Sequence, residues 1–410
     1  MEPVPLAWSA PFAGLLLGIA VLPLAAAHWW EHNRNKAIVA AVFAVPVALW
    51  AFGTMRHDLG HAVLEYVSFL CLLGSLYVVA GGVHVSGDLR ASPLVNAAFL
   101  AAGAALANVV GTTGASMLLI RPLLRTNSGR RHVVHTVVFF IFMVCNTGGL
   151  LTPLADPPLF VGFLRGVPFA WPLGLWKEWL LVNGALLSIY LLIDGNRVLL
   201  ETPAALRRDR RDLEPLRIHG KRNLLLLLGV VALVLWAPGG LREAGMVALA
   251  AVSWFATPRD VHARNQFGWG PIVEVAVLFA GIFVTMGPAL AYLREHAASL
   301  GVREPMQFFW ATGALSSFLD NTPTYVCFLE LARGLPGPDE VAGVSHGVLA
   351  AISCGAVLMG ANTYIGNGPN FMVRAIAEAQ GLKMPSFFGY MLWSIAILVP
   401  LFFVASLLLF

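Results

Sequence analysis

The sequence has few charged residues. Only 12% of its 410 residues are Asp, Glu, Lys or Arg, whereas 58% are hydrophobic. Soluble domains usually carry about 25% charged residues, so this composition argues against an ordinary soluble protein. Apolar runs near the roughly 20 residues that a helix needs to cross a bilayer recur along the whole chain. The sequence therefore predicts an all-α polytopic membrane protein, with the lipid bilayer as its surroundings.

Several other features are missing. The four cysteines (Cys71, Cys145, Cys327 and Cys354) are scattered in apolar segments without a C-x-x-C spacing, which favours small buried side chains over metal or disulfide roles. The sequence shows no nucleophile–base pair, metal cluster or phosphate-binding loop, so we expect no enzymatic activity and no cofactor. The net charge of +4 is modest and its positive residues lie in loops, which indicates membrane topology and not nucleic-acid binding.

One apolar segment is interrupted at residues 145–160, CNTGGLLTPLADPPLF. Its prolines Pro153, Pro157 and Pro158 remove backbone donors and clash with the preceding turn, so a continuous helix cannot run through it. Unpaired backbone at membrane depth is tolerated only inside protein or beside a cavity. Because the break also carries Asp156, it predicts a binding site within the membrane.

The order of segments repeats with an offset of roughly 210 residues. TPLADPPLF (152–160) aligns with TYIGNGPNF (363–371), which places Asp156 opposite Asn367. Interrupted helices at matching positions of two halves indicate a midplane site in a secondary transporter. We predict a first repeat at 1–196, a charged cytoplasmic linker at 197–222 and a second repeat at 223–410.

Two pairs of apolar segments, 94–107 with 111–124 and 306–319 with 322–334, are too short to span comfortably. We interpret each pair as a re-entrant hairpin, although two full spans remain an alternative. Each half then has about five transmembrane helices, one of them broken, plus a hairpin. Because five is odd, the second repeat is inverted. With both termini outside, the cytoplasmic loops receive 19 of the 26 Lys and Arg residues and the outer loops receive 7, as the positive-inside rule requires.

Four polar breaks are thus expected to converge: 107–116, 146–158, 316–326 and 360–370. Hydroxyls, amide oxygens, carbonyls and carboxylates suit a small alkali cation, whereas helix N-termini suit an anion. Asp156 and Asp320 are the only aspartates in these breaks, and a charge at the bilayer centre costs roughly 2.5–3.5 kcal/mol. Each should therefore be paired, ion-bound or protonated, although a helix cap is an alternative for both residues.

The motifs GGLLTPLADPPLF, FLDNTPTYV and GANTYIGNGPNF resemble those of the ion-transporter superfamily, which includes sodium/proton antiporters, arsenite permeases and citrate or dicarboxylate carriers. The resemblance covers nearly the whole chain. It is closest to the branch of D-type sodium/proton antiporters and citrate transporters, although Ala107-Asn108 stands where antiporters often have Asp-Asn. It implies an elevator-like movement of the hairpin-bearing part and a possible homodimer.

This resemblance and the four breaks predict one set of residues that bind sodium or a proton. The set comprises Asn108, Thr112, Thr113, Asn146, Thr152, Asp156, Asp320, Asn321, Thr322, Asn362, Thr363 and Asn367. We expect a sodium/proton antiporter of a bacterial-type inner membrane, with a sodium- or proton-coupled citrate or dicarboxylate carrier as the alternative. Against the carrier, no Arg lies within the breaks to bind a carboxylate. Proton-carrying and structural roles both remain open for Glu65, Glu274, His135 and His346.

Overall fold

The computed structural model describes residues 4–87, 89–201, 217–337 and 340–410. Within these ranges it is nearly all helical, and seven helical stretches are long and apolar enough to cross a membrane. The protein is thus a multi-pass membrane protein, as predicted. Most of the predicted linker 197–222, with its arginine cluster, lies outside the described residues.

The first half contains, in chain order, η1 (Leu6–Ser9), α1 (Ala10–Ala25), α2 (Ala27–Trp30), α3 (Asn33–Thr54), α4 (Arg56–Gly81), β1 (His84–Ser86), α5 (Pro93–Thr126), α6 (Val134–Phe142), η2 (Met143–Thr147), α7 (Pro157–Leu164), η3 (Trp171–Leu175) and α8 (Trp176–Val198).

The second half presents its helices in the same order as the first. In each half, three longer helices and one short helix precede a hairpin, a helix with a central break follows, and one long helix ends the half. Its elements are β2 (Arg217–His219), α10 (Arg222–Trp236), α11 (Leu241–Ala256), α12 (Arg259–Arg264), α13 (Gly270–Glu295), η4 (Ala297–Ser299), α14 (Pro305–Ser316), α15 (Asn321–Arg333), α16 (His346–Met359), η5 (Gly360–Asn362), α17 (Gly368–Ala379) and α18 (Phe387–Leu409). That the two halves are inverted repeats stays a prediction.

The stretch named α5 folds back on itself. Gly111 has φ +80°, a conformation that glycine adopts without a steric penalty, and it separates two helical arms. The side chains of Asn96 and Asn127 exchange hydrogen bonds of 2.9 and 2.8 Å. In a straight helix these residues would be about 46 Å apart, so the arms must lie side by side.

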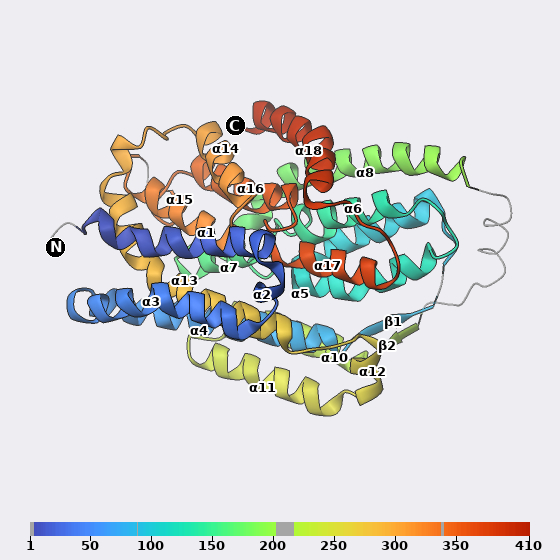
Figure 1. Cartoon of the computed structure of the whole chain (residues 1–410), viewed down its shortest axis with the longest axis horizontal. Coiled ribbons are helices and arrows are strands. Elements are labelled where there is room, and N and C mark those ends of the chain that lie inside the picture. Colours follow the sequence, from blue (N-terminus) through green and yellow to red (C-terminus); the bar gives the residue numbers. More distant parts are fainter. Residues whose placement is uncertain (1–3, 88, 202–216, 338–339) are drawn as a thin grey trace.

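The second hairpin consists of α14 and α15, joined by residues 317–320. The rings of Phe308 and Phe328, each about two turns from the connection, lie 6.3 Å apart. Figure 1 shows the two hairpins reaching inward from opposite ends of the molecule, α5 from the right and α14–α15 from the left. The bilayer itself is not part of the structure, so re-entry from opposite sides stays a prediction.

Both broken helices have the same local form. After α6 the chain makes the π-helical turn η2, leaves helical structure, and resumes at Pro157; after α16 it makes the 3-10 turn η5 and resumes at Gly368. The residues before the second stubs, Asp156 and Asn367, both have extended backbones, with φ/ψ of −143°/141° and −153°/141°. A proline in the first turn of α7 and of α17, where a missing N–H costs nothing, favours the start of each helix at that point.

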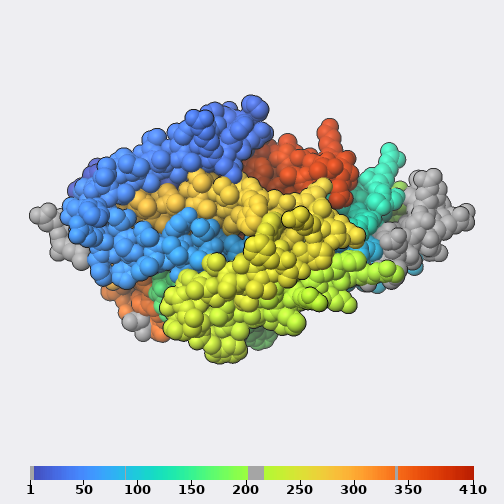
Figure 2. Space-filling view, turned by 90° about the horizontal axis from the view of Figure 1, so that it is seen from below, coloured from blue at the N-terminus to red at the C-terminus, as the bar shows by residue number. Residues whose placement is uncertain are grey.

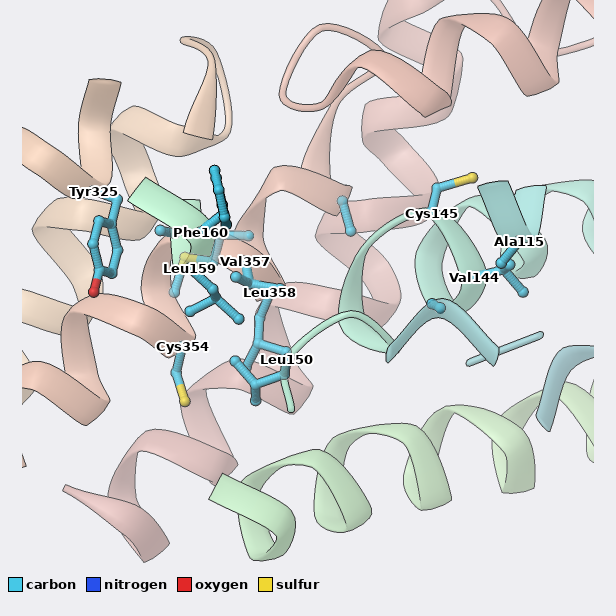
Figure 3. Packing of buried hydrophobic residues seen from close by; sticks show 14 of the residues in the cluster. Ala115, Val144, Cys145, Leu150, Leu159, Phe160, Tyr325, Cys354, Val357 and Leu358 are labelled. Atoms are coloured by element: carbon cyan, nitrogen blue, oxygen red, sulfur yellow. The ribbon is translucent and has the colours of Figure 1, made fainter. Parts of the chain in front are cut away.

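The hairpin tips and the breaks meet inside the molecule, and the helices α3, α4, α10 and α11 lie along one side of it (Figure 1). Figure 2 shows one outer face, where α13 in gold lies between α3 and α4 in blue and α10, α11 and α12 in yellow-green and yellow. Figure 3 shows the packing inside: Leu159 and Phe160 of α7 lie beside Val357 and Leu358 of α16. All four of these side chains are at most 2% exposed.

The structure adds a small sheet that the all-α prediction did not include. Strands β1 and β2 pair antiparallel, with His84 opposite His219 and Ser86 opposite Arg217. Each strand has only three residues, too few for a sequence pattern to reveal. The pairing joins the two halves at the end of the molecule predicted to be cytoplasmic.

Candidate functional site

Asp156 is a buried carboxylate at the end of the first break. Its side chain is 1% exposed. Asp156 is the residue directly before helix α7, yet its carboxylate makes no capping hydrogen bond to that helix. The simple helix-cap interpretation is therefore wrong for Asp156, because the carboxylate points toward other elements.

The carboxylate of Asp156 accepts three hydrogen bonds from three separate segments. Thr112 Oγ1 of α5 and Asn367 Nδ2, just before α17, each lie 3.1 Å from Oδ1. Asn321 Nδ2, the first residue of α15, lies 2.6 Å from Oδ2. Both hairpin tips and both broken helices thus meet at one carboxylate, which is the predicted convergence.

The groups that hydrogen-bond to Asp156 are uncharged. Its hydrogen-bonding partners are one hydroxyl and two amides, and the four breaks contain no Lys or Arg. Each amide also carries an acceptor oxygen, so a rotation would turn Asn321 or Asn367 from a donor into a cation ligand. The arrangement can hold a negative charge by hydrogen bonding, or it can present several oxygens to a cation.

The first hairpin tip is fixed to the first broken helix through Asn108. Its Nδ2 donates to Gly148 O at 2.7 Å, and its Oδ1 accepts from Leu151 N at 2.8 Å. Thr152 Oγ1 donates to the carbonyl of Asn108 at 2.6 Å. Asn108 and Thr152, both predicted site residues, therefore hold the tip against the break and do not bond to Asp156.

The second half repeats these three contacts with Ser317. Its hydroxyl lies 2.8 Å from Gly313 O and 3.2 Å from Met359 O, the two acceptors that share its proton, and it accepts from Asn362 Nδ2 at 2.9 Å. Thr363 Oγ1 donates to the carbonyl of Ser317 at 2.5 Å. Each partner in this broken helix lies 211 residues after its counterpart, so the two halves share this geometry as well as their order of helices.

The two broken helices are also joined to each other. Asn146 Nδ2 donates to Asn370 Oδ1 at 2.8 Å, and Asn367 Nδ2 donates to the carbonyl of Cys145 at 3.0 Å. Asn146 is fully buried, and its Oδ1 has no hydrogen-bond partner among the described residues. Asn362 Oδ1 is in the same condition. These oxygens leave acceptor capacity near the centre of the site.

Asp320 has a different environment from Asp156. It is half-buried, and its carboxylate accepts from the backbone N–H of Thr322 at 2.9 Å, capping α15. The capping alternative is thus what the structure shows for Asp320, and ion binding by this residue stays a prediction. Thr113 is half-buried, and neither it nor Thr322 bonds to Asp156 through its side chain.

The residues whose roles were left open lie in ion pairs or packing contacts away from Asp156. Glu65 pairs with Arg165 at 2.8 Å, and Arg165 also pairs with Glu330 at 3.1 Å. Glu274 pairs with Lys36 at 2.7 Å. His135 Nε2 lies 2.9 Å from Asp194 in a buried cluster with Arg130, and His346 Nδ1 lies 3.1 Å from Trp171 Nε1.

Three residues of this network were not singled out from the sequence. Ser317 and Asn370 lie within predicted breaks, but repeat alignment gives no polar counterpart for Asn370, which stands opposite Leu159. Asn183 in α8 donates to the carbonyl of Thr147 at 3.1 Å and accepts from its hydroxyl at 2.8 Å. A single Asn inside an apolar span is itself a signal of internal contact, and it could have identified Asn183.

Comparison with known proteins assigns the chain to a family. The model of the family described as "Putative citrate transport" matches residues 1–410. The chain belongs to this family. Membership agrees with the ion-transporter resemblance at the level of a membrane transporter, and it does not separate the antiporter branch from the citrate branch.

Curated proteins give more distant matches to this member of the citrate transport family. It is 25% identical to the P protein of Mus musculus over 190 residues, which cover 40% of this chain and 22% of that protein. It is 26% identical to the P protein of Homo sapiens over 180 residues, 38% of this chain and 21% of that protein. The match therefore spans about a fifth of these relatives' length.

Proposed function

We propose that the protein is a secondary active transporter that exchanges sodium ions for protons at Asp156. The observation that carries this proposal is the single buried carboxylate on which two hairpin tips and two broken helices converge. A charge buried at that depth requires a partner, and its hydrogen-bonding partners are all neutral. A sodium ion or a proton would supply the missing positive charge, and the two would compete for one carboxylate.

The origin of the site's groups supports an elevator-like mechanism. Asp156 and its three hydrogen-bonding partners belong to α5, α15 and the two breaks. The outer helices α3, α10 and α11 contribute none of these groups. A part made of the hairpins and broken helices could therefore move past the outer helices without taking the site apart, carrying the bound ion across. A homodimer, predicted from the family resemblance, would anchor the outer helices.

The family description favours a second candidate, a cation-coupled carrier of citrate. The electrostatics of the site count against direct binding of citrate beside Asp156, because the breaks contain no Lys or Arg and like charges repel. In a carrier, the stub N-termini at Pro157 and Gly368 would hold the anion while Asp156 held the coupling cation.

Flux measurements in proteoliposomes separate the two candidates. An imposed sodium gradient should drive proton movement, reported by an enclosed pH-sensitive dye, without citrate in the buffer. If the sodium gradient drove uptake of radiolabelled citrate, and drove no proton movement when citrate was absent, the carrier would be the correct function and the antiporter would be wrong. Liposomes without protein, and liposomes with potassium in place of sodium, serve as controls.

A further inference from the structure

Two histidines at the start of α4 form a geometry that the proposed transport site does not use. His57 and His61 are both exposed, four residues apart on one face of the helix. Their Nε2 atoms lie 3.3 Å apart, and their ring centroids are separated by 4.5 Å. The two Nε2 atoms therefore point toward each other, and neither ring is turned away from the other.

The distance between these two nitrogens matches the distance between two nitrogen ligands of one metal ion. Zinc–imidazole bonds are about 2.0–2.1 Å long, and a tetrahedral angle between two of them places the nitrogens about 3.3–3.4 Å apart. Histidines at i and i+4 of a helix are an established arrangement for holding zinc. We propose that His57 and His61 form a binding site for a divalent transition metal of the zinc, nickel or copper class, whose remaining ligands are water.

The neighbouring residues define how many ligands the protein supplies. Glu65 is the next residue on the same face, but its carboxylate is held by Arg165 at 2.8 Å. Asp58 follows His57 directly, so it points about 100° away around the helix and lines a small cavity with Phe283. Within the described ranges, no group of three His, Cys, Asp or Glu residues is placed to hold a metal. The protein thus supplies two histidine ligands, here called the two-histidine clip (His57 and His61), and water molecules can fill the remaining coordination positions of the metal.

The chain offers a matched control in His28 and His32. They have the same spacing, but α2 ends at Trp30, so the helix does not hold them together. Their ring centroids are 6.1 Å apart, and His28 Nδ1 lies 3.5 Å from Glu31. Removing this pair changes the number of histidines equally without touching the proposed clip.

Zinc binding to the full-length protein tests the proposal. The protein, purified through a tag without histidine and held in detergent, is titrated with zinc chloride by calorimetry at about pH 7.5. We expect one zinc site in the wild type and in H28A/H32A, and a loss of at least roughly tenfold in affinity in H57A, in H61A and in the double variant H57A/H61A, since even outer-shell partners of metal ligands contribute about 10- to 100-fold. Because both side chains are exposed, these variants should fold, and unchanged thermal unfolding without zinc checks this.

A spectroscopic measurement distinguishes the clip from a simple hydrogen bond between the two rings. Copper(II) bound to the wild type should show two equatorial imidazole nitrogens by electron paramagnetic resonance, reduced to one or none in H61A. Equal zinc affinity in the wild type and H57A/H61A, or a copper spectrum with a single imidazole in the wild type, would overturn the assignment. A drop in H28A/H32A equal to that in H57A/H61A would do the same.

Discussion

The substitution Asp156→Asn removes the charge and the proton from the site while keeping its shape. The new amide oxygen can still accept from Thr112 and Asn367, while its NH2 group faces Asn321. Losing one charge-assisted hydrogen bond costs about 1.5–3 kcal/mol. Removing a charge from the bilayer centre recovers about 2.5–3.5 kcal/mol. The two effects nearly cancel, so we expect a folded protein with thermal stability close to that of the wild type.

The effect of Asp156→Asn on ion binding should be much larger. Two unit charges about 4 Å apart attract by about 4 kcal/mol at an effective dielectric constant of about 20. Losing that attraction weakens sodium binding by about a thousandfold. The amide that replaces the carboxylate also has no proton to exchange. Sodium/proton exchange should therefore be abolished, whereas Asp156→Glu should keep weak activity with an altered pH profile.

The assay is sodium-induced proton movement in everted membrane vesicles, with expression checked by immunoblot. Asp260→Asn, at an exposed aspartate paired with Arg264 on the surface, is the matched control and should exchange at the wild-type rate. Exchange by well-expressed Asp156→Asn at the parental rate would refute the mechanism. If Asp156→Asn lost sodium-coupled citrate uptake and the wild type showed no sodium/proton exchange, the protein would be the cation-coupled carrier.

Three further substitutions test other parts of the structure. Asp320→Asn keeps an acceptor for the N–H of Thr322, so it should impair transport less than Asp156→Asn in the same vesicle assay; equal loss would show that Asp320 also binds the ion. Gly148→Ala places a methyl group 2.5 Å from the backbone of Ala104, so it should destabilise the hairpin by about 1–3 kcal/mol and slow exchange, while Gly174→Ala, with open space, should not. Asp194→Asn removes the carboxylate that Arg130 and His135 share and leaves Glu201, 4.0 Å from Arg130 Nε, as the remaining carboxylate partner, so it should lower stability by at most about 3–5 kcal/mol, measured as a fall in the thermal unfolding temperature.

The sequence was sufficient to predict where the breaks lie and that they converge, because each break has a strong local cause. Proline at residues 153, 157 and 158 interrupts a helix regardless of tertiary context, and an aspartate in an apolar segment must have a partner. Short apolar pairs around polar tips likewise predicted the two hairpins. The convergence on Asp156 followed from combining these local signals with the alignment of the two halves.

What the sequence did not reveal depends on contacts between distant residues. The pairing of Arg165 with Glu330 joins positions 165 residues apart, and nothing local marks either as the other's partner. The hydrogen-bonding set of Asp156 was also not predictable within the candidate list. Asn108 and Thr152 share the polar character of Thr112, yet they bond to the break, because only the fold determines which way each side chain points.

Sodium binding to the purified protein as a function of pH tests the central claim most directly. If sodium and protons compete at Asp156, the apparent dissociation constant for sodium should rise about tenfold for each unit that the pH falls below the titration of the site, and binding should release protons. Asp156→Asn should show neither effect. Sodium binding that is independent of pH, or that persists unchanged in Asp156→Asn, would contradict the account.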